Sequence, residues 1–171
     1  MDTSTNMIWT PRVLSILRIV SGYVLLLHGT AKLLGVPHVP MFDGLQIASL
    51  SGVAGIIELV FGALLVIGLF TRIAAFIASG FTAAAYFIGH VATKGELLFP
   101  LLNGGEAAVL FCFVFLFIAF AGPGPWSVDA MRGKSRVGAR DAAATAVQAA
   151  NDPSPEQSAV ERDLGRRVES A

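Results

Sequence analysis

The chain has 171 residues, of which 54% are hydrophobic and 14% are charged, and its mean hydropathy is +0.69. These values exclude an ordinary soluble domain. The twelve basic residues are balanced by twelve acidic ones, so there is no excess of positive charge for binding nucleic acid. Residues 1–132 contain nearly all the long apolar runs. We therefore predict one membrane domain over 1–132, followed by a polar, disordered cytoplasmic tail over 133–171.

The first apolar run predicts a membrane span and not a cleavable signal peptide. Asp2 precedes the run, Arg18 and Lys32 interrupt it, and no small-residue cleavage site follows a short apolar core. The span is predicted over about residues 12–35, with Thr10-Pro11 as its start and Gly35 as its end.

A second span is predicted over about residues 46–70. The spacing of Asp43 and Gln46 is that of a capping box, and Glu58 is the only charge in the apolar run that follows. Three glycines align with Glu58 at helical spacing and predict a face that another helix can approach closely. These glycines are Gly52, Gly55 and Gly62.

A third span is predicted over about residues 72–91, after a tight connection with Gly68 as C-cap and Thr71 as N-cap. A fourth is predicted over about residues 104–121, with a capping-box spacing from Asn103 to Glu106. The segment Gly122-Pro-Gly-Pro125 ends it. The predicted fold is therefore all-α, an integral membrane four-helix bundle.

Four spans place both termini on one side of the membrane. In one orientation the cytoplasmic flanks contain six basic residues, and the opposite flanks contain only Lys32 and Lys94. The positive-inside rule therefore predicts a bacterial inner-membrane protein with both termini in the cytoplasm. The six basic residues are Arg12, Arg72, Arg132, Lys134, Arg136 and Arg140.

Ionisable side chains inside a bilayer normally face protein or water and have partners. Arg18 and Lys32 lie on one face of the first helix, and the predicted orientation places most of the other polar groups in the outer half of the bundle. The candidate ligand-binding cluster consists of Arg18, His28, Lys32, Glu58, His90, Asn103 and Glu106.

Structural explanations of these residues stay open. Glu106 can be part of a helix cap, Lys32 can extend to the interface, and His90 can be a solvated helix end. Arg18 and Glu58 can form a structural ion pair.

The sequence favours neither a haem nor a metal. The similar depth of His28 and His90 suggests bis-histidine haem ligation. His28, His90 and Glu106 together suggest a metal site. No close-spaced ligand motif supports either hypothesis. Cys112 stands alone in an apolar run and is expected to be a buried, unpaired thiol.

Several segments resemble the DoxX family of small four-span membrane proteins. They are Arg18 with HGTAKLLG at 28–35, GIIELVFGALLVIGLFTRIAAF at 55–76, FPLLNGGEAAVLF at 99–111 and GPGPWSVDA at 122–130. The resemblance covers about residues 13–130 and implies an association with quinol oxidases, thiosulfate:quinone oxidoreduction or oxidative-stress complexes. By this resemblance, the family's polar motif positions are Arg18, His28, Lys32, Glu58, Arg72, Asn103, Glu106 and Asp129.

Three hypotheses follow for function. The first is an accessory subunit of a membrane redox complex that interacts with a quinone and with other membrane or redox subunits. The second is a non-catalytic scaffold whose tail recruits soluble partners. The third is a small-solute or proton pathway. The sequence identifies no catalytic residue, and it leaves a homo-oligomer open.

Overall fold

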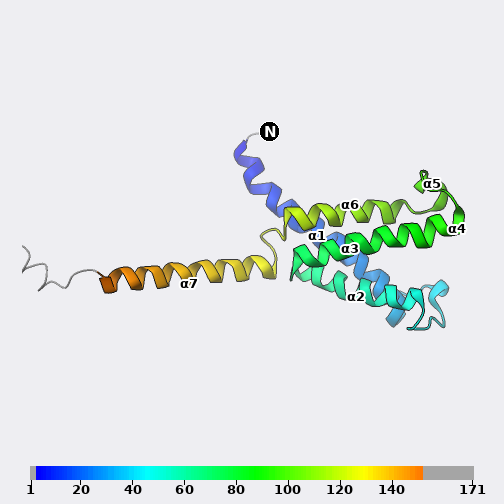
Figure 1. The fold of residues 1–171 in the computed structure, drawn as a ribbon, viewed down its shortest axis with the longest axis horizontal. Helices are drawn as coiled ribbons and strands as arrows, with labels where there is room; N and C mark the ends of the chain where they lie inside the picture. The colour runs from blue at the N-terminus through cyan, green and yellow to red at the C-terminus, as the bar shows by residue number, and fades with distance from the viewer. Residues whose placement is uncertain (1–2, 152–171) are drawn as a thin grey trace, which may run out of the picture. The chain divides into compact units, whose positions relative to one another are not determined.

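The computed structural model describes residues 3–151, without the side chains of residues 3–7, 136, 137, 139 and 145–151. The described chain is all-α, as predicted (Figure 1). The long helices are α1 (Thr3–Leu34), α2 (Leu50–Ile67), α3 (Thr71–Ala85), α6 (Glu106–Ala121) and α7 (Val128–Asn151). The short ones are η1 (Pro40–Phe42), the π-helical η2 (Tyr86–Val91), α4 (Ala92–Lys94) and α5 (Pro100–Asn103).

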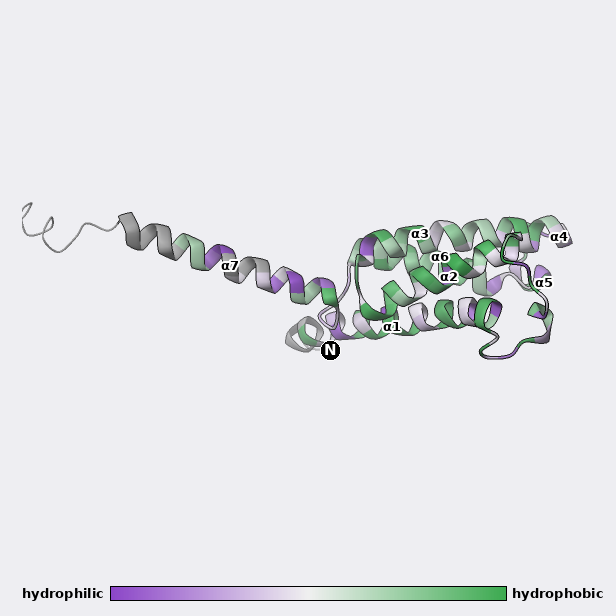
Figure 2. Ribbon diagram, turned by 90° about the horizontal axis from the view of Figure 1, so that it is seen from below, coloured by the Kyte–Doolittle hydropathy of each residue, from purple (hydrophilic) through white to green (hydrophobic). Residues whose placement is uncertain are grey.

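Three helical stretches among the described residues are long and apolar enough to cross a membrane. They are Ile8–Leu34, Leu50–Ile67 and Thr71–Lys94, the last of which runs continuously through α3, η2 and α4. The predicted fourth span corresponds to α6, which has only 16 residues, or about 24 Å of helix. Figure 2 shows α1, α2, α3 and α6 as mainly hydrophobic.

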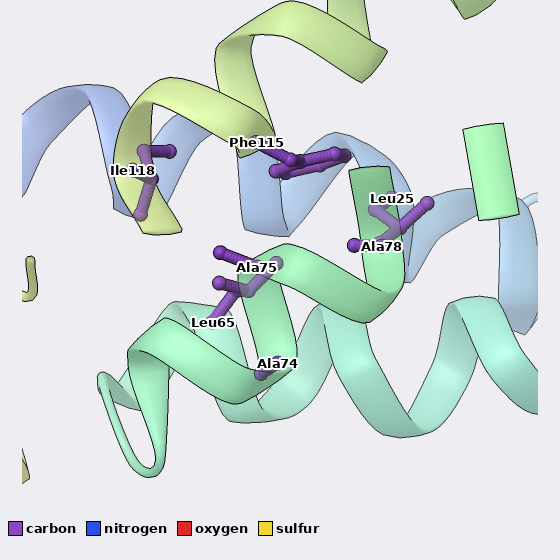
Figure 3. Packing of buried hydrophobic residues seen from close by; sticks show 7 residues of the cluster. All are labelled: Leu25, Leu65, Ala74, Ala75, Ala78, Phe115 and Ile118. Atoms are coloured by element: carbon purple, nitrogen blue, oxygen red, sulfur yellow. The ribbon is translucent and has the colours of Figure 1, made fainter. Parts of the chain in front are cut away.

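The four long helices of the first compact unit, Met1–Arg132, pack as a ring. Neighbours around it are α1 with α2, α2 with α3, α3 with α6, and α6 with α1. Figure 3 shows the buried centre, where Phe115 and Ile118 of α6 lie over the alanine-rich face of α3. The buried cluster is Leu25, Leu65, Ala74, Ala75, Ala78, Phe115 and Ile118.

The backbones of α1 and α2 come into direct contact at glycines. A Cβ on Gly62 would lie 2.5 Å from the backbone nitrogen of Leu26, and one on Gly29 would lie 2.7 Å from the Cα of Leu59. A Cβ on Gly55 would lie 3.1 Å from the Cβ of Lys32. This contact confirms the predicted close approach at the small-residue face of α2.

Two predicted helix starts are wrong. The α1 helix begins at Thr3, and Pro11 lies inside it, because a proline removes one main-chain hydrogen bond without ending every helix. The α2 helix begins at Leu50, where Ser49 is the N-cap and its side chain accepts from the N–H of Gly52. Asp43 does not cap α2, because its carboxylate bonds the ring of His38 at 3.0 Å.

The other two starts also differ by a residue or more. Thr71 is the first residue of α3, and the N-cap is Phe70 in the left-handed conformation. Glu106 is the first residue of α6, and the N-cap is Gly105, so the capping box at Asn103 is absent. The predicted C-cap at Gly68 is confirmed, and α6 ends at Ala121, directly before the Gly122-Pro-Gly-Pro125 segment, as predicted.

The second unit, Gly133–Ala171, contains the described continuation of α7 through Asn151. This differs from the expectation of a disordered tail over residues 133–151. Alanine is the strongest helix former, and six of the ten residues 141–150 are alanine. The rest of the predicted tail, 152–171, lies outside the described residues.

The glycine contact predicts a position-dependent effect of one substitution. Gly62→Ala should lower the free energy of unfolding by about 1–3 kcal/mol, because the added Cβ overlaps the backbone of α1. Gly80→Ala in α3 is the matched control, since a Cβ there meets nothing within 4 Å. Denaturation of both variants in detergent measures the difference, and equal stability of the two would contradict the close packing.

Candidate functional site

The structure divides the predicted polar cluster between two ends of the bundle. Arg18 and Lys32 lie on the buried face of α1 but are 14 residues apart, a rise of about 21 Å. Glu58, His90 and Asn103 lie toward the Lys32 end, and Arg18 is bonded to other segments.

Arg18 is fully buried and bonds only main-chain carbonyls in the described structure. Its Nε donates to the carbonyl of Pro123 at 2.8 Å, and one terminal nitrogen donates to Val66 at 2.9 Å. Further bonds go to the carbonyls of Leu65 and Trp126. The guanidinium therefore caps the C-terminus of α2 and joins it to the loop after α6.

Gly68 makes room for this cap. Its φ is +70°, and a Cβ there would lie 2.9 Å from the Cζ of Arg18 and would also overlap Ser127. The hydroxyl of Ser15 accepts from the N–H of Trp126 at 3.2 Å, which holds the same loop against α1. This bond holds the N-terminal half of α1 and the loop that leads into α7 together at one end of the bundle.

Two motif positions named by the family resemblance complete this end. Arg72 donates to the carbonyls of Ala119 and Phe120 at 3.0 and 2.7 Å, which caps α6. Asp129 accepts from the N–H groups of Phe70 and Thr71 at 3.0 and 2.8 Å and so caps α3. Partial burial opposes ionisation of Asp129, but the hydrogen bonds from Thr71 and Phe70 outweigh it and lower its pKa.

At the other end, Lys32 and Glu58 form a closed ion pair. The Lys32 Nζ lies 2.7 and 2.8 Å from the two carboxylate oxygens, and the side chains are 13% and 7% exposed. The ring of Phe42 covers the ammonium at 5.6 Å. The structural ion pair considered from the sequence was Arg18 with Glu58, but the structure shows that the partner of Glu58 is Lys32.

A cavity of about 320 Å³ opens beside this ion pair. Its walls come mostly from apolar residues of α2 and α3, and its polar wall includes Lys32, Glu58 and His90. An apolar cavity with a few convergent polar groups is the usual form of a small-molecule site. The apolar walls include Val53, Ala54, Ile57, Phe81, Ala84, Ala85 and Ile88.

His90 reaches the cavity from the π-helical segment η2, a type of distortion that is frequent at functional sites. Its Nδ1 lies 3.2 Å from the main-chain oxygen of Asn103, and its ring stacks on Tyr86. A carbonyl oxygen can only accept, so Nδ1 donates and Nε2 is the acceptor in the neutral ring. The Asn103 side chain is fully buried and bonds the Tyr86 hydroxyl and the carbonyl of Glu96.

His28 and Glu106 are not part of this wall. Both are exposed; the His28 ring bonds its own helix at the carbonyl of Val24, and Glu106 lies at the first position of α6. No group of three or more His, Cys, Asp or Glu side chains in the described part of the chain is arranged to hold a metal ion. Cys112 is a free, partly buried thiol.

The sequence does not indicate the main-chain partners of Arg18 or the aromatic cover of Lys32. Carbonyl groups have no sequence signature, so nothing in the residue pattern could have indicated the first. Phe42 lies in the loop between the first two spans, ten residues from Lys32, and carries no signal that distinguishes it from an ordinary apolar residue.

These features define a multi-pass α-helical membrane protein with a mainly apolar cavity, into which a few polar groups converge, toward one end. The chain belongs to the DoxX family, whose match covers residues 13–91. It is also 48% identical over 123 residues to an uncharacterized protein of Haemophilus influenzae, which covers 71% of this chain and 91% of that protein. No solved structure matches the chain.

The closed ion pair predicts strong coupling between its partners. Lys32→Met leaves the Glu58 carboxylate buried without a partner and should cost about 3–5 kcal/mol of stability. The double variant Lys32→Met/Glu58→Leu should recover most of this loss, because it removes both charges. Denaturation in detergent measures the coupling, and Lys94→Met, at an exposed lysine, is the control. A Lys32→Met variant as stable as the parent protein would contradict the ion pair between Lys32 and Glu58.

Proposed function

We propose that the cavity beside Lys32 and Glu58 binds the head group of a membrane quinone. The protein would then serve as an accessory, quinone-interacting subunit of a membrane redox complex. The observation that supports this proposal is the composition of the cavity wall: apolar side chains of α2 and α3 converge with Lys32, Glu58 and His90.

A quinone head group needs a flat apolar slot and polar groups for its oxygens. Phe81 and the alanines of α3 provide apolar surface. The Lys32 ammonium has three N–H groups and uses two of them on the Glu58 carboxylate oxygens, so the third remains to donate to a quinone oxygen. His90, held at Nδ1 by Asn103, offers Nε2 to a hydroxyl of the reduced form.

The source of the ligand would be the bilayer itself. The cavity is lined by residues of helices that are long enough to cross the membrane, and its walls are mainly apolar. A lipid-soluble ligand can therefore enter between α2 and α3 without passing through water. In this proposal, electron transfer depends on a partner subunit, and no residue of this chain is assigned to catalysis.

Substitution of the two histidines tests the proposal. His90→Leu should weaken binding of ubiquinone or menaquinone analogues, and His28→Leu should leave it unchanged, because only His90 lines the cavity. Both rings bond a main-chain carbonyl through Nδ1, so His28 is a closely matched control.

Calorimetry and thermal shifts on the purified protein in nanodiscs measure this binding. Thermal unfolding without ligand shows whether each variant keeps its fold. The proposal fails if the parent protein carries no quinone after purification and added quinones leave its unfolding temperature unchanged.

A non-catalytic scaffold is the second candidate, and it is supported by α7. This helix of 24 residues contains polar and charged residues as well as alanines, which suits binding to soluble partners. In that case Glu58→Gln should lower stability or assembly, with no separate effect on a redox flux. A Glu58→Gln variant that folds normally but loses the flux would favour the quinone-interacting subunit.

We also propose that the Arg18 end faces the cytoplasm of a bacterial inner membrane. The N-terminal half of α1 and the loop that leads into α7 are joined at this end by the bond between Ser15 and Trp126. Arg12, Arg72 and Arg132 belong to the flanks at this end, which agrees with the positive-inside rule.

Topology reporters measure the orientation. A fluorescent protein fused after Ala171 should fluoresce, and alkaline phosphatase inserted after Gly44 should be active, because that enzyme requires export. The opposite pattern, with an active phosphatase at the C-terminus and none at Gly44, would overturn the orientation and leave the cavity proposal intact.

A further inference from the structure

The segment between the third and fourth membrane helices exposes a continuous apolar surface. Leu98 and Leu101 are 78% and 73% exposed, and their large neighbours are all at least half exposed. Single exposed apolar residues are common, but a run of five in one short connection marks an interaction surface. We name this surface the apolar loop; it consists of Leu97, Leu98, Phe99, Leu101 and Leu102.

The apolar loop lies at the level where the membrane helices end. The helix before it, Thr71–Lys94, has 24 residues, or about 36 Å, and the hydrocarbon core is about 30 Å thick. Its end therefore reaches the membrane–water interface. The charges of Lys94 and Glu96 precede the loop, and Figure 1 shows α5 at the end of the bundle where α4 ends.

Buried polar side chains satisfy the backbone of this irregular segment. The Asn103 amide donates to the carbonyl of Glu96 at 2.6 Å, and the Tyr86 hydroxyl donates to that of Leu97 at 2.7 Å. The N–H of Gly105 donates to the carbonyl of Pro100 at 3.0 Å. Non-helical backbone is tolerated near lipid only when its polar groups have such partners.

Further contacts tie the end of the loop to Tyr86 of η2. Gly105 packs its backbone on the Tyr86 ring, where a Cβ would lie 2.6 Å from two ring carbons. The Asn103 side chain also accepts from the N–H of Gly105 at 2.8 Å. The leucines are therefore exposed on an anchored backbone, which lowers the entropy cost of ordering this segment at a surface.

We propose that the apolar loop inserts into the head-group boundary of the leaflet at the Lys32 end of the bundle. Its occupant is the phospholipid leaflet, because the loop follows an apolar helix that is long enough to cross the membrane and itself exposes large apolar side chains. Apolar area at this boundary stabilises interfacial segments. Asn103 then links the inserted loop to His90, so the leaflet also positions one wall of the cavity, whatever ligand the cavity binds.

Site-directed fluorescence tests the insertion. Leu98→Cys and Leu101→Cys, made in a Cys112→Ala background, receive a bimane label in full-length protein reconstituted in phosphatidylcholine–phosphatidylglycerol vesicles. Lys94→Cys is the control, because Lys94 is exposed at the end of α4. We expect blue-shifted emission at Leu98 and Leu101, quenching by brominated acyl chains and loss of quenching by aqueous iodide.

Iodide quenching at Leu98 and Leu101 equal to that at Lys94 would overturn the proposal and assign the loop to a protein partner. A second measurement needs neither purified protein nor a bimane label. A water-soluble maleimide added to opened membranes should modify Lys94→Cys and leave Leu98→Cys unmodified. Modification of both thiols, or of neither, would also overturn the insertion.

Discussion

The fold depends on how a bundle with an apolar exterior accommodates the buried Arg18 guanidinium. A charge at this depth needs acceptors, and carbonyls of Leu65, Val66, Pro123 and Trp126 provide them. The last turn of a helix has unpaired carbonyls and partial negative charge. One arginine therefore satisfies the end of α2, ties the loop after α6 to α1, and needs no buried carboxylate of its own.

This arrangement gives the two ends of the bundle different roles. Near Arg18 the charged groups complete helices: Arg72 caps α6, and Asp129 caps α3. Near Lys32 the charged groups line a cavity, because Glu58 bonds Lys32 and not the main chain. The end with structural capping can hold the helices in place while the other end keeps a space between α2 and α3. A charged pair that is not committed to a helix end thus faces the cavity at the Lys32 end.

Helical periodicity was sufficient to predict the buried face of α1, the glycine face of α2 and three polar residues that line the cavity, Lys32, Glu58 and His90. It could not predict the partner of Arg18, since carbonyls occur at every residue, nor the capping of α3 by Asp129 from 58 positions along the chain. The helix caps predicted at Asp43 and Asn103 are wrong for a related reason. Their side chains bond His38 in one case and Tyr86 and Glu96 in the other, and these are partners that only the folded loops bring together.

The packing between the two ends bears on the choice among functions. A proton relay through the bundle would need polar groups or water along the roughly 21 Å between Arg18 and Lys32. Over that distance α1 presents Gly22, Leu25 and Gly29, and the two glycines touch the backbone of α2 so closely that a Cβ would not fit. This part of the α1–α2 interface is occupied mainly by apolar atoms and main chain, and the buried Ser21 hydroxyl of α1 bonds carbonyls of its own helix. The polar groups at the Lys32 end are thus separated from Arg18 along this interface, an arrangement that suits a binding site reached from the bilayer better than a path across it.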